Sequence, residues 1–190
     1  MTDILILYYS KTGHTKKIAK EIANGAMLVE NCDVKMRTVL ASNDSNSNAM
    51  LVTKADLKSC HGLAFGSPTR FGNIASPLQS FLETTSDLWL SGSLIGKPAA
   101  LFTSSSSLHG GQESTLLSMS LPLLHHGMLL LGIPYSCAEL SKTKSGGTPY
   151  GASHFSGNQN DLDMTDDERI LARNLGERLA QTAKMLMEKS

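Results

Sequence analysis

Hydroxyl-bearing and basic side chains gather in one short run near the start of the sequence, made of Ser10, Lys11, Thr12, Gly13, His14 and Thr15. The apolar residues 4–9 come directly before this run and predict a buried strand. Apolar residues then recur at helical spacing from Ile18 to Ala26 and predict a helix. The first backbone N–H groups of a helix lack partners within it and carry the positive end of its dipole. The run therefore predicts an anion site, to which its hydroxyls add donors and its glycine adds close backbone approach.

This polar run does not match the two commonest phosphate-binding loops. The Walker A pattern G-x-x-x-x-G-K-[ST] and the dinucleotide-binding pattern G-x-G-x-x-G are both absent from the sequence. A serine- and threonine-rich turn between a strand and a helix can also serve only to cap the helix. The run alone leaves both interpretations open, so the surrounding elements must decide between them.

The overall composition narrows the class of protein. The length of 190 residues predicts a single domain, residues 1–190. Its 17 basic residues balance its 17 acidic ones, so the net charge indicates neither a nucleic-acid partner nor an anionic membrane surface. Cys32, Cys60 and Cys137 are odd in number and widely spaced, which argues against a disulfide framework and against a zinc site. Reduced cysteines, together with the lack of a leader or a membrane-length apolar run, predict a cytoplasmic protein.

Strand-like and helix-like segments alternate along the chain. Loop insertions without periodicity interrupt the alternation near residues 41–54 and 136–164. The last helix is expected to begin with a capping-box pair, Thr165 and Glu168, and the helix before it to be broken or kinked by Pro122. After the first pair, strands are predicted at residues 34–38, 62–66, 98–103 and 128–131, and helices around residues 78–82 and 112–126.

This alternation predicts an α/β fold, a doubly wound five-stranded parallel sheet in the order 2-1-3-4-5 with helices on both faces. Ligands of such sheets bind at the carboxyl ends of the strands, near the switch in winding direction. In this order the first, third and fourth strands are neighbours, and each is followed by a polar loop, at residues 10–15, 67–73 and 104–111. The convergence of three polar loops favours a binding site over a mere helix cap.

Several strings of residues resemble one known family. The first loop matches the flavodoxin phosphate pattern [ST]-x-T-G-x-T. The strings GSPTRFGN at residues 66–73, HHGM at 125–128 and GGTPYGA at 146–152 resemble the WrbA family of flavodoxin-like, FMN-dependent NAD(P)H:quinone oxidoreductases, once called tryptophan-repressor binding proteins. The resemblance runs from the first strand to the last helix and implies a flavodoxin-like fold that binds FMN.

The resemblance also implies roles by position. The first loop would hold the FMN phosphate, the second would meet the isoalloxazine and ribityl portions, and the third would flank the other edge of the ring. His125 would contribute to FMN binding from a neighbouring segment, while Trp89 and Phe71 would line an apolar slot for the flat quinone. The second loop consists of Pro68, Thr69, Arg70, Phe71, Gly72 and Asn73, and the third of Ser104, Ser105, Ser106, Ser107, Leu108, His109 and Gly110.

A flavin carries out hydride chemistry itself, so the protein needs only to bind, orient and tune it. The sequence offers no nucleophile-base pair and no paired carboxylates, and we assign no catalytic residue and no metal site. The predicted activity is FMN-dependent two-electron reduction of quinones by NAD(P)H, in which hydride passes to FMN and then to the quinone. Two other functions stay open: a flavodoxin-type electron carrier and a non-catalytic FMN-binding regulatory partner.

The predicted partners are small molecules and copies of the chain itself. A quinone is the expected substrate, and NAD(P)H is the expected co-substrate. The resemblance implies a homotetramer, with a dimer as the alternative, in which insertions build the active site between subunits. No direct nucleic-acid contact and no membrane insertion are predicted.

Overall fold

The computed structural model describes residues 1–40 and 49–188, so most of the predicted insertion near residues 41–54 lies outside the described residues. The central layer is a parallel sheet in the order β2-β1-β3-β4-β5. The predicted order 2-1-3-4-5 is therefore confirmed. The five strands are β1 (Thr2–Tyr8), β2 (Cys32–Thr38), β3 (Gly62–Pro68), β4 (Pro98–Ser105) and β5 (Leu129–Leu131).

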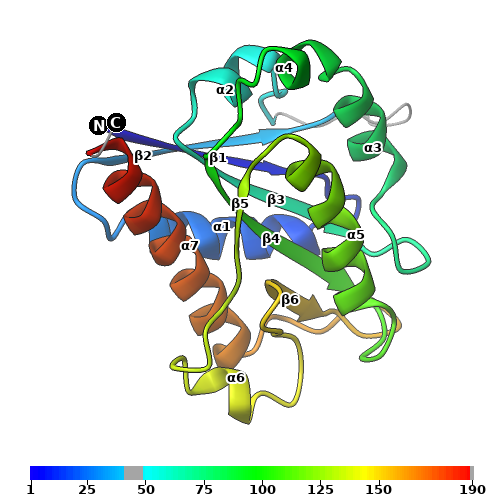
Figure 1. Cartoon of the computed structure of the whole chain (residues 1–190). Coiled ribbons are helices and arrows are strands. Elements are labelled where there is room, and N and C mark those ends of the chain that lie inside the picture. The colour runs from blue at the N-terminus through cyan, green and yellow to red at the C-terminus, as the bar shows by residue number, and fades with distance from the viewer. Residues whose placement is uncertain (41–48, 189–190) are drawn as a thin grey trace.

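Helices cover both faces of this sheet (Figure 1). The helices α1 (His14–Ala26) and α7 (Asp166–Met187) lie side by side on one face. The opposite face packs against α5 (Gln112–His125) and α3 (Ser76–Glu83), with the shorter α2 (Lys54–Ser59) and α4 (Ser86–Leu90) beside them. This is the doubly wound arrangement predicted from the alternating pattern.

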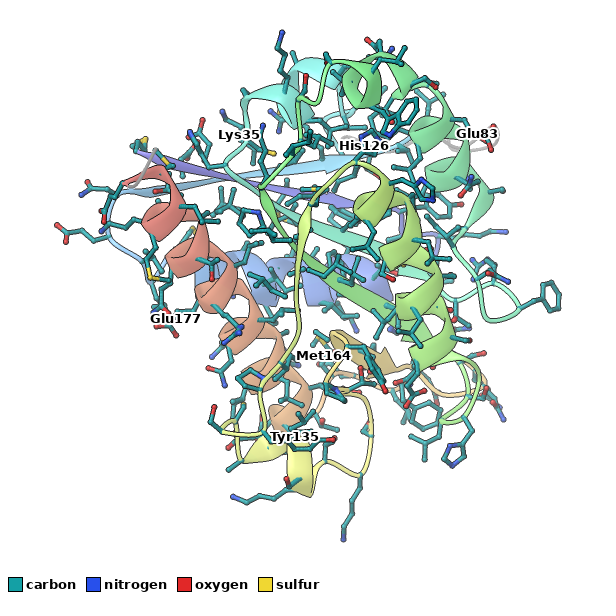
Figure 2. All side chains as sticks on the ribbon, in the orientation of Figure 1. Lys35, Glu83, His126, Tyr135, Met164 and Glu177 are labelled. Atoms are coloured by element: carbon teal, nitrogen blue, oxygen red, sulfur yellow. The ribbon has the colours of Figure 1, made fainter. Side chains whose placement is uncertain are left out.

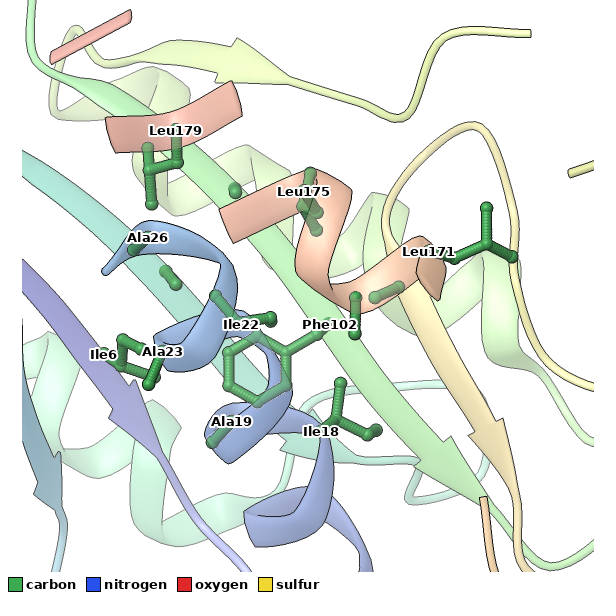
Figure 3. Packing of buried hydrophobic residues seen from close by; sticks show 14 of the residues in the cluster. Ile6, Ile18, Ala19, Ile22, Ala23, Ala26, Phe102, Leu171, Leu175 and Leu179 are labelled. Carbon is green, nitrogen blue, oxygen red and sulfur yellow. The ribbon is translucent and has the colours of Figure 1, made fainter. Parts of the chain in front are cut away.

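The residues of β1 alternate between the two faces. Ile4 and Ile6 pack into the layer formed with α1 and α7, whereas Leu5 and Leu7 pack into the opposite layer. Successive side chains of a strand point to opposite faces, so a strand buried on both sides is apolar throughout. Figure 3 shows the first layer, in which Phe102 of β4 lies among side chains of α1 and α7.

Two glycines bring α1 and α7 into close contact. A Cβ added at Gly25 would lie 1.9 Å from the carbonyl oxygen of Arg173, and one at Gly176 would lie 2.0 Å from that of Ile22. Only glycine fits at such distances, so the two backbones can approach each other directly. This contact joins the carboxyl-terminal half of α1 to the middle of α7 and fixes the two helices against each other.

The segment 136–164 is more regular than its sequence indicated. It contains a short helix, α6 (Glu139–Lys142), and a sixth strand, β6 (Ala152–Phe155), which pairs in parallel with β4. The prediction of a five-stranded sheet with a structureless insertion was wrong in this respect. β5 pairs only with residues 98–100 of β4, and β6 pairs with residues 102–105, which would otherwise be an open sheet edge.

Two local predictions about helix ends can be compared with the structure. Pro122 does not break α5, which is one helix to His125, although proline lacks the N–H that would donate to the carbonyl four residues earlier. The capping box of α7 is confirmed, since the Thr165 hydroxyl accepts from the Glu168 backbone N–H while the Glu168 carboxylate accepts from that of Thr165. Within the part of the chain that the structure describes, no helix is long and apolar enough to cross a membrane.

Candidate functional site

The three polar loops meet at the carboxyl edge of the sheet. They surround a small polar hollow of about 190 Å³, which we call the serine pocket. A fourth segment, which follows β6, closes one wall of it. The lining residues are Thr12 from the first loop, Pro68, Thr69 and Arg70 from the second, Ser104, Ser105 and Ser106 from the third, and Ser156 and Asn160 from the fourth segment.

The start of α1 beside this pocket is open to a ligand. Gly13 precedes the helix in a left-handed conformation with φ 92° and has no side chain with which to cap it. A Cβ at this position would meet no atom within 4 Å, so the space next to Gly13 is free. Ser10 stays close, because its hydroxyl accepts a hydrogen bond from the backbone N–H of Lys16 at 3.2 Å. A helix start with exposed N–H groups and nearby hydroxyls favours a bound anion.

Short hydrogen bonds hold the loops together beneath the pocket. The hydroxyls of Thr15 and Ser104 are 2.8 Å apart and link the first loop to the third. The Thr69 backbone N–H donates to the Ser104 carbonyl at 2.8 Å, and the Thr69 hydroxyl contacts the Thr115 hydroxyl of α5. The loops are therefore fixed by the folded chain before any ligand binds.

A buried cluster lies behind the start of α1. His14 Nδ1 is 3.2 Å from His154 Nε2, and His154 Nδ1 is 2.9 Å from the Glu168 carboxylate. Burial by itself would raise the pKa of Glu168, but hydrogen bonds from His154, Phe155 and Thr165 outweigh it and hold the pKa below its usual value. Burial lowers the pKa of His14, and the charges of His154 and Lys17 lower it further. The hydrogen bond to the Asn160 backbone and the charge of Asp163 act in the opposite direction, but the pKa stays below its usual value.

A second, larger hollow of about 560 Å³ lies between α5 and the segment that carries α3 and α4. We call it the tryptophan pocket. Figure 2 shows His126 at the end of α5, facing this segment. His126 Nε2 lies 3.0 Å from the Thr85 hydroxyl, and burial, together with the charge of His125, lowers its pKa. The lining residues are Asn73, Ile74, Gln79, Leu82, Thr85, Ser86, Trp89, Ser118, Leu121, Pro122, His125 and His126.

The structure divides the predicted site residues between these two pockets. Trp89, Asn73 and His125 line the tryptophan pocket, so His125 lies with the predicted quinone contact and not with the serine-lined loops. Phe71 lines neither pocket, because its ring is fully exposed on a backbone with φ 51°. The predicted residues in the serine pocket are Thr12, Pro68, Thr69, Arg70, Ser104, Ser105 and Ser106, and those that flank it in the same loops are Ser10, Lys11, Gly13, His14, Thr15, Gly72, Ser107, Leu108, His109 and Gly110.

Four residues at this site were missed by the sequence analysis. Ser156 and Asn160 line the serine pocket, while His154 and Glu168 support His14 behind it. Glu168 had a sequence signal, but only for helix capping, and the other three lie in a segment without periodicity. Within residues 1–40 and 49–188, no group of three or more His, Cys, Asp and Glu side chains is arranged to hold a metal ion.

Comparison with known proteins places the chain in a family. A family model described as "NADPH-dependent FMN reductase" matches residues 2–139. The chain belongs to this FMN reductase family. Curated relatives named "NAD(P)H dehydrogenase (quinone)" are 38% identical in Geotalea daltonii, over 97% of this chain and 98% of the relative, and 38% identical in Chromohalobacter salexigens, over 98% and 99%. The relationship that the flavodoxin-like motifs predicted is confirmed by these matches.

Solved structures agree on the fold of this FMN reductase family member. A "flavodoxin, WrbA-like protein" from Agrobacterium tumefaciens superposes with a TM-score of 0.75 at 23% identity, covering 97% of this chain and 99% of the other. A "flavodoxin from the domain Archaea" gives a TM-score of 0.66 at 22% identity, covering 96% and 99%. At this identity the likeness concerns the fold alone, and it confirms the flavodoxin-like arrangement.

Proposed function

We propose that this protein catalyses FMN-dependent two-electron reduction of quinones by NAD(P)H. The observation that carries the proposal is the serine pocket beside the start of α1 at Gly13, at the carboxyl ends of β1, β3 and β4. This is the position where parallel α/β sheets bind ligands. Membership of the FMN reductase family and the names of the quinone-reducing relatives support the same activity.

The residues present fit the FMN phosphate. The pocket offers hydroxyls from three loops, free space next to Gly13 and the positive end of a helix of 13 residues. We propose that residues 10–15 hold the phosphate, that residues 68–73 meet the ring and ribityl chain, and that residues 104–110 flank the other edge of the ring. When bound, FMN supplies the hydride chemistry, and the chain supplies binding, orientation and electrostatics.

Arg70 is the cationic side chain best placed to tune the site. It lines the serine pocket, and its guanidinium donates to the Thr69 carbonyl at 2.9 Å, which holds the charge at the second loop. A fixed positive charge beside a group that gains negative charge stabilises the charged form, by an amount that grows as water is excluded. We propose this role for Arg70.

The tryptophan pocket suits a flat substrate. Trp89 and Leu121 bring apolar surface to it, and the imidazoles of His125 and His126 lie at the same wall. An indole ring can stack on a planar quinone at little entropic cost, and an imidazole can exchange a proton near neutral pH. We propose that quinone and nicotinamide use this side of the site in turn, with Phe71 as a second stacking group and His125 as a contact to FMN or quinone.

The same surface supports a proposal about assembly. Trp89 is 53% exposed, and Leu121 and Leu124 of α5 are 59% and 51% exposed, which is a large apolar area for neighbouring side chains. We propose that copies of the chain assemble through this face as a homotetramer, or as a dimer. We also propose that residues 1–190 form one domain and that the protein acts in the cytoplasm. Analytical ultracentrifugation at several protein concentrations tests the assembly.

The activity is tested by anaerobic mixing of FMN-loaded protein with NADH and with NADPH, followed by addition of benzoquinone. We expect the flavin absorption band to bleach and then to recover rapidly. Binding of FMN without bleaching would contradict the proposal and favour an electron carrier or a non-catalytic regulatory partner. A chain that binds no FMN would overturn all three.

A further inference from the structure

The Glu168 carboxylate is deeply buried and surrounded by hydrogen-bond donors. One oxygen accepts from the Ser145 hydroxyl at 2.8 Å and from the backbone N–H groups of Gly146 at 2.8 Å and Phe155 at 3.0 Å. The other faces the Thr165 N–H and His154 Nδ1, both at 2.9 Å. Three of these five partners are backbone N–H groups, which can only donate, so the site favours an ionised carboxylate.

From this carboxylate a line of polar contacts runs to the wall of the serine pocket. Glu168 meets His154 Nδ1, His154 Nε2 meets His14 Nδ1 at 3.2 Å, and His14 Nε2 meets the Asn160 carbonyl oxygen at 3.1 Å. We call these four groups the relay. Asn160 lines the serine pocket, and His14 is the first residue of α1, directly after the free space at Gly13.

The number of hydrogens in the relay follows from its geometry. Each of the three contacts needs one hydrogen, and the last must come from His14 because a carbonyl oxygen has none to give. Burial lowers the pKa of His14 and so favours its neutral form, whose Nδ1 can only accept once Nε2 carries the hydrogen, and His154 must then donate from Nε2 as well. Two neutral imidazoles and an ionised carboxylate carry two hydrogens in total, and the relay requires three. The third hydrogen makes His154 an imidazolium between Glu168 and His14.

We propose that the relay holds this extra proton and thereby positions Asn160, in the wall of the serine pocket, against the phosphate-binding loop. Affinity for the FMN phosphate then falls when the proton is lost. The inference rests on the proposed function, because it takes the ligand of the serine pocket to be the phosphate of FMN. His14 and Asn160 border the ligand, whereas His154 and Glu168 act through them as positioning residues.

Loss of the proton must break one contact of the relay. With two hydrogens left for three contacts, a lone pair must face the Glu168 carboxylate, the other imidazole or the Asn160 carbonyl, and each of these arrangements is repulsive. Where the broken contact is the one to Asn160, its carbonyl loses the His14 hydrogen bond of 3.1 Å, and its backbone is then held by the N–H that donates to the Gly157 carbonyl at 3.0 Å. Its side chain is held separately by the Ser156 hydroxyl at 3.1 Å, which is also in the pocket wall.

Neighbouring charges act on the relay from two elements. Lys17 of α1 disfavours a charge on His14, and Asp163, from the segment before α7, favours one. The two neutralise each other in an ion pair of 2.9 Å, and Asp163 also pairs with Arg169 of α7 at 2.8 Å. Burial lowers the pKa of His14, which agrees with a neutral His14 and a proton on its neighbour.

The test compares His154→Gln with His61→Gln, in full-length apoprotein. Glutamine has one amide nitrogen and cannot donate to Glu168 and His14 on opposite sides, so the relay is cut. His61 is a matched control, because its Nδ1 accepts from the Asp3 backbone N–H at 2.9 Å, beside the start of β3 and away from the serine pocket. The FMN dissociation constant is measured by fluorescence quenching between about pH 7 and pH 9.5, above the second ionisation of a phosphate monoester near pH 6.

We expect the wild-type protein and His61→Gln to lose affinity roughly tenfold across this range, since one charge-assisted hydrogen bond is worth about that factor. His154→Gln should bind about tenfold more weakly at pH 7 and show a flat profile. An unchanged profile in folded His154→Gln would overturn the proposal.

Nitrogen NMR of the wild-type imidazoles gives an independent measurement that needs no variant. At pH 7 we expect one imidazolium and one neutral imidazole protonated at Nε2 for the pair of His154 and His14. Two neutral imidazoles would overturn the relay even if FMN binds. If the wild-type protein binds neither FMN nor inorganic phosphate at any pH, the proposed function fails, and the NMR result still decides whether the relay holds its proton.

Discussion

The serine pocket and the tryptophan pocket border the same second loop but are built in opposite ways. The serine pocket is small and polar, and buried hydrogen bonds such as that between Thr15 and Ser104 fix its walls. The tryptophan pocket is about three times larger, and Trp89 and Leu121 on its rim are more than half exposed. His126 Nδ1 at its wall is buried, and it is without a hydrogen-bond partner within the described part of the chain.

This difference supports the proposal that a single chain completes the serine pocket, whereas a second chain covers the tryptophan pocket. Rigid donors at an anion site pay no reorganisation cost when the ligand binds, which suits a cofactor that stays bound. Exposed apolar surface is stabilised when another molecule covers it, and a buried nitrogen without a partner is stabilised when another molecule supplies a hydrogen bond. The comparison therefore supports the proposal that the serine pocket binds the cofactor and that the tryptophan pocket exchanges substrate and contacts another subunit.

The largest expected effect concerns the support of the serine pocket. Replacement of Glu168 by glutamine turns one acceptor oxygen into an amide donor that faces N–H groups. We expect a loss of about 3–5 kcal/mol in the free energy of unfolding, measured with urea. The control is Glu83→Gln, an exposed residue (Figure 2) whose carboxylate accepts from the Gln79 side chain, and it should change the free energy of unfolding by less than about 1 kcal/mol. A loss of similar size in both variants would contradict a preorganised pocket.

We expect Glu168→Gln also to change how the free energy of unfolding depends on pH under acid conditions. The folded-state pKa of Glu168 is lowered, so the stability it contributes is present above its ordinary pKa of 4.5 and is lost as the pH falls through the lowered value. Stability of the wild-type protein should therefore fall below about pH 4.5, and the fall should be shallower in Glu168→Gln. Asp163, whose pKa the Lys17 hydrogen bond lowers to about 2, should leave a remaining slope in both proteins.

A smaller effect, on FMN affinity, should show that the serine pocket and the tryptophan pocket bind different ligands. Thr12→Val removes a hydroxyl from the serine pocket, and we expect FMN to bind more weakly by about 1.5–3 kcal/mol, the usual worth of a hydrogen bond to a charged group. The KM for quinone at saturating FMN should stay unchanged. Thr182→Val, whose hydroxyl bonds only to the Arg178 carbonyl within α7, is the control and should leave FMN affinity as it is.

The converse variant is Trp89→Ala. We expect the KM for quinone to rise by roughly tenfold, about 1.4 kcal/mol, because the stacking surface is lost, while the FMN dissociation constant stays unchanged. Leu90→Ala is the matched control, since Leu90 is the next residue of α4, is 77% exposed and does not line the pocket. Equal losses in both ligands for Trp89→Ala would show that the two pockets are not separate.

The smallest expected effect is at Phe71, between the two pockets. Its left-handed backbone is costly for phenylalanine but not for glycine, so Phe71→Gly should raise the free energy of unfolding by less than about 1 kcal/mol. Phe71→Ala keeps the left-handed cost and should bring no such gain. If Phe71 stacks on quinone, both variants should raise the KM for quinone, and an unchanged KM would remove Phe71 from the proposed substrate site.

Much of the architecture could be predicted from local patterns. Apolar runs such as residues 4–9, helical spacing from Ile18 to Ala26 and the Thr165 capping box each depend on a few neighbouring residues. The order of the five strands followed from the rules for parallel sheets. That order in turn predicted that the three polar loops lie close together. β6 escaped prediction because its four residues do not alternate and because its partner strand, β4, is far away in the sequence.

The sequence by itself determined that a polar turn stands between the first strand and the first helix, because hydroxyls, a glycine and the helix start are neighbours in the chain. Only the tertiary structure decided what stands behind that turn. His14 meets His154 across 140 positions and Asn160 across 146, and no periodicity links residues so far apart. The division of Thr12 and Trp89 between two pockets was decided in the same way, because burial and distance arise only when the helices pack on the sheet.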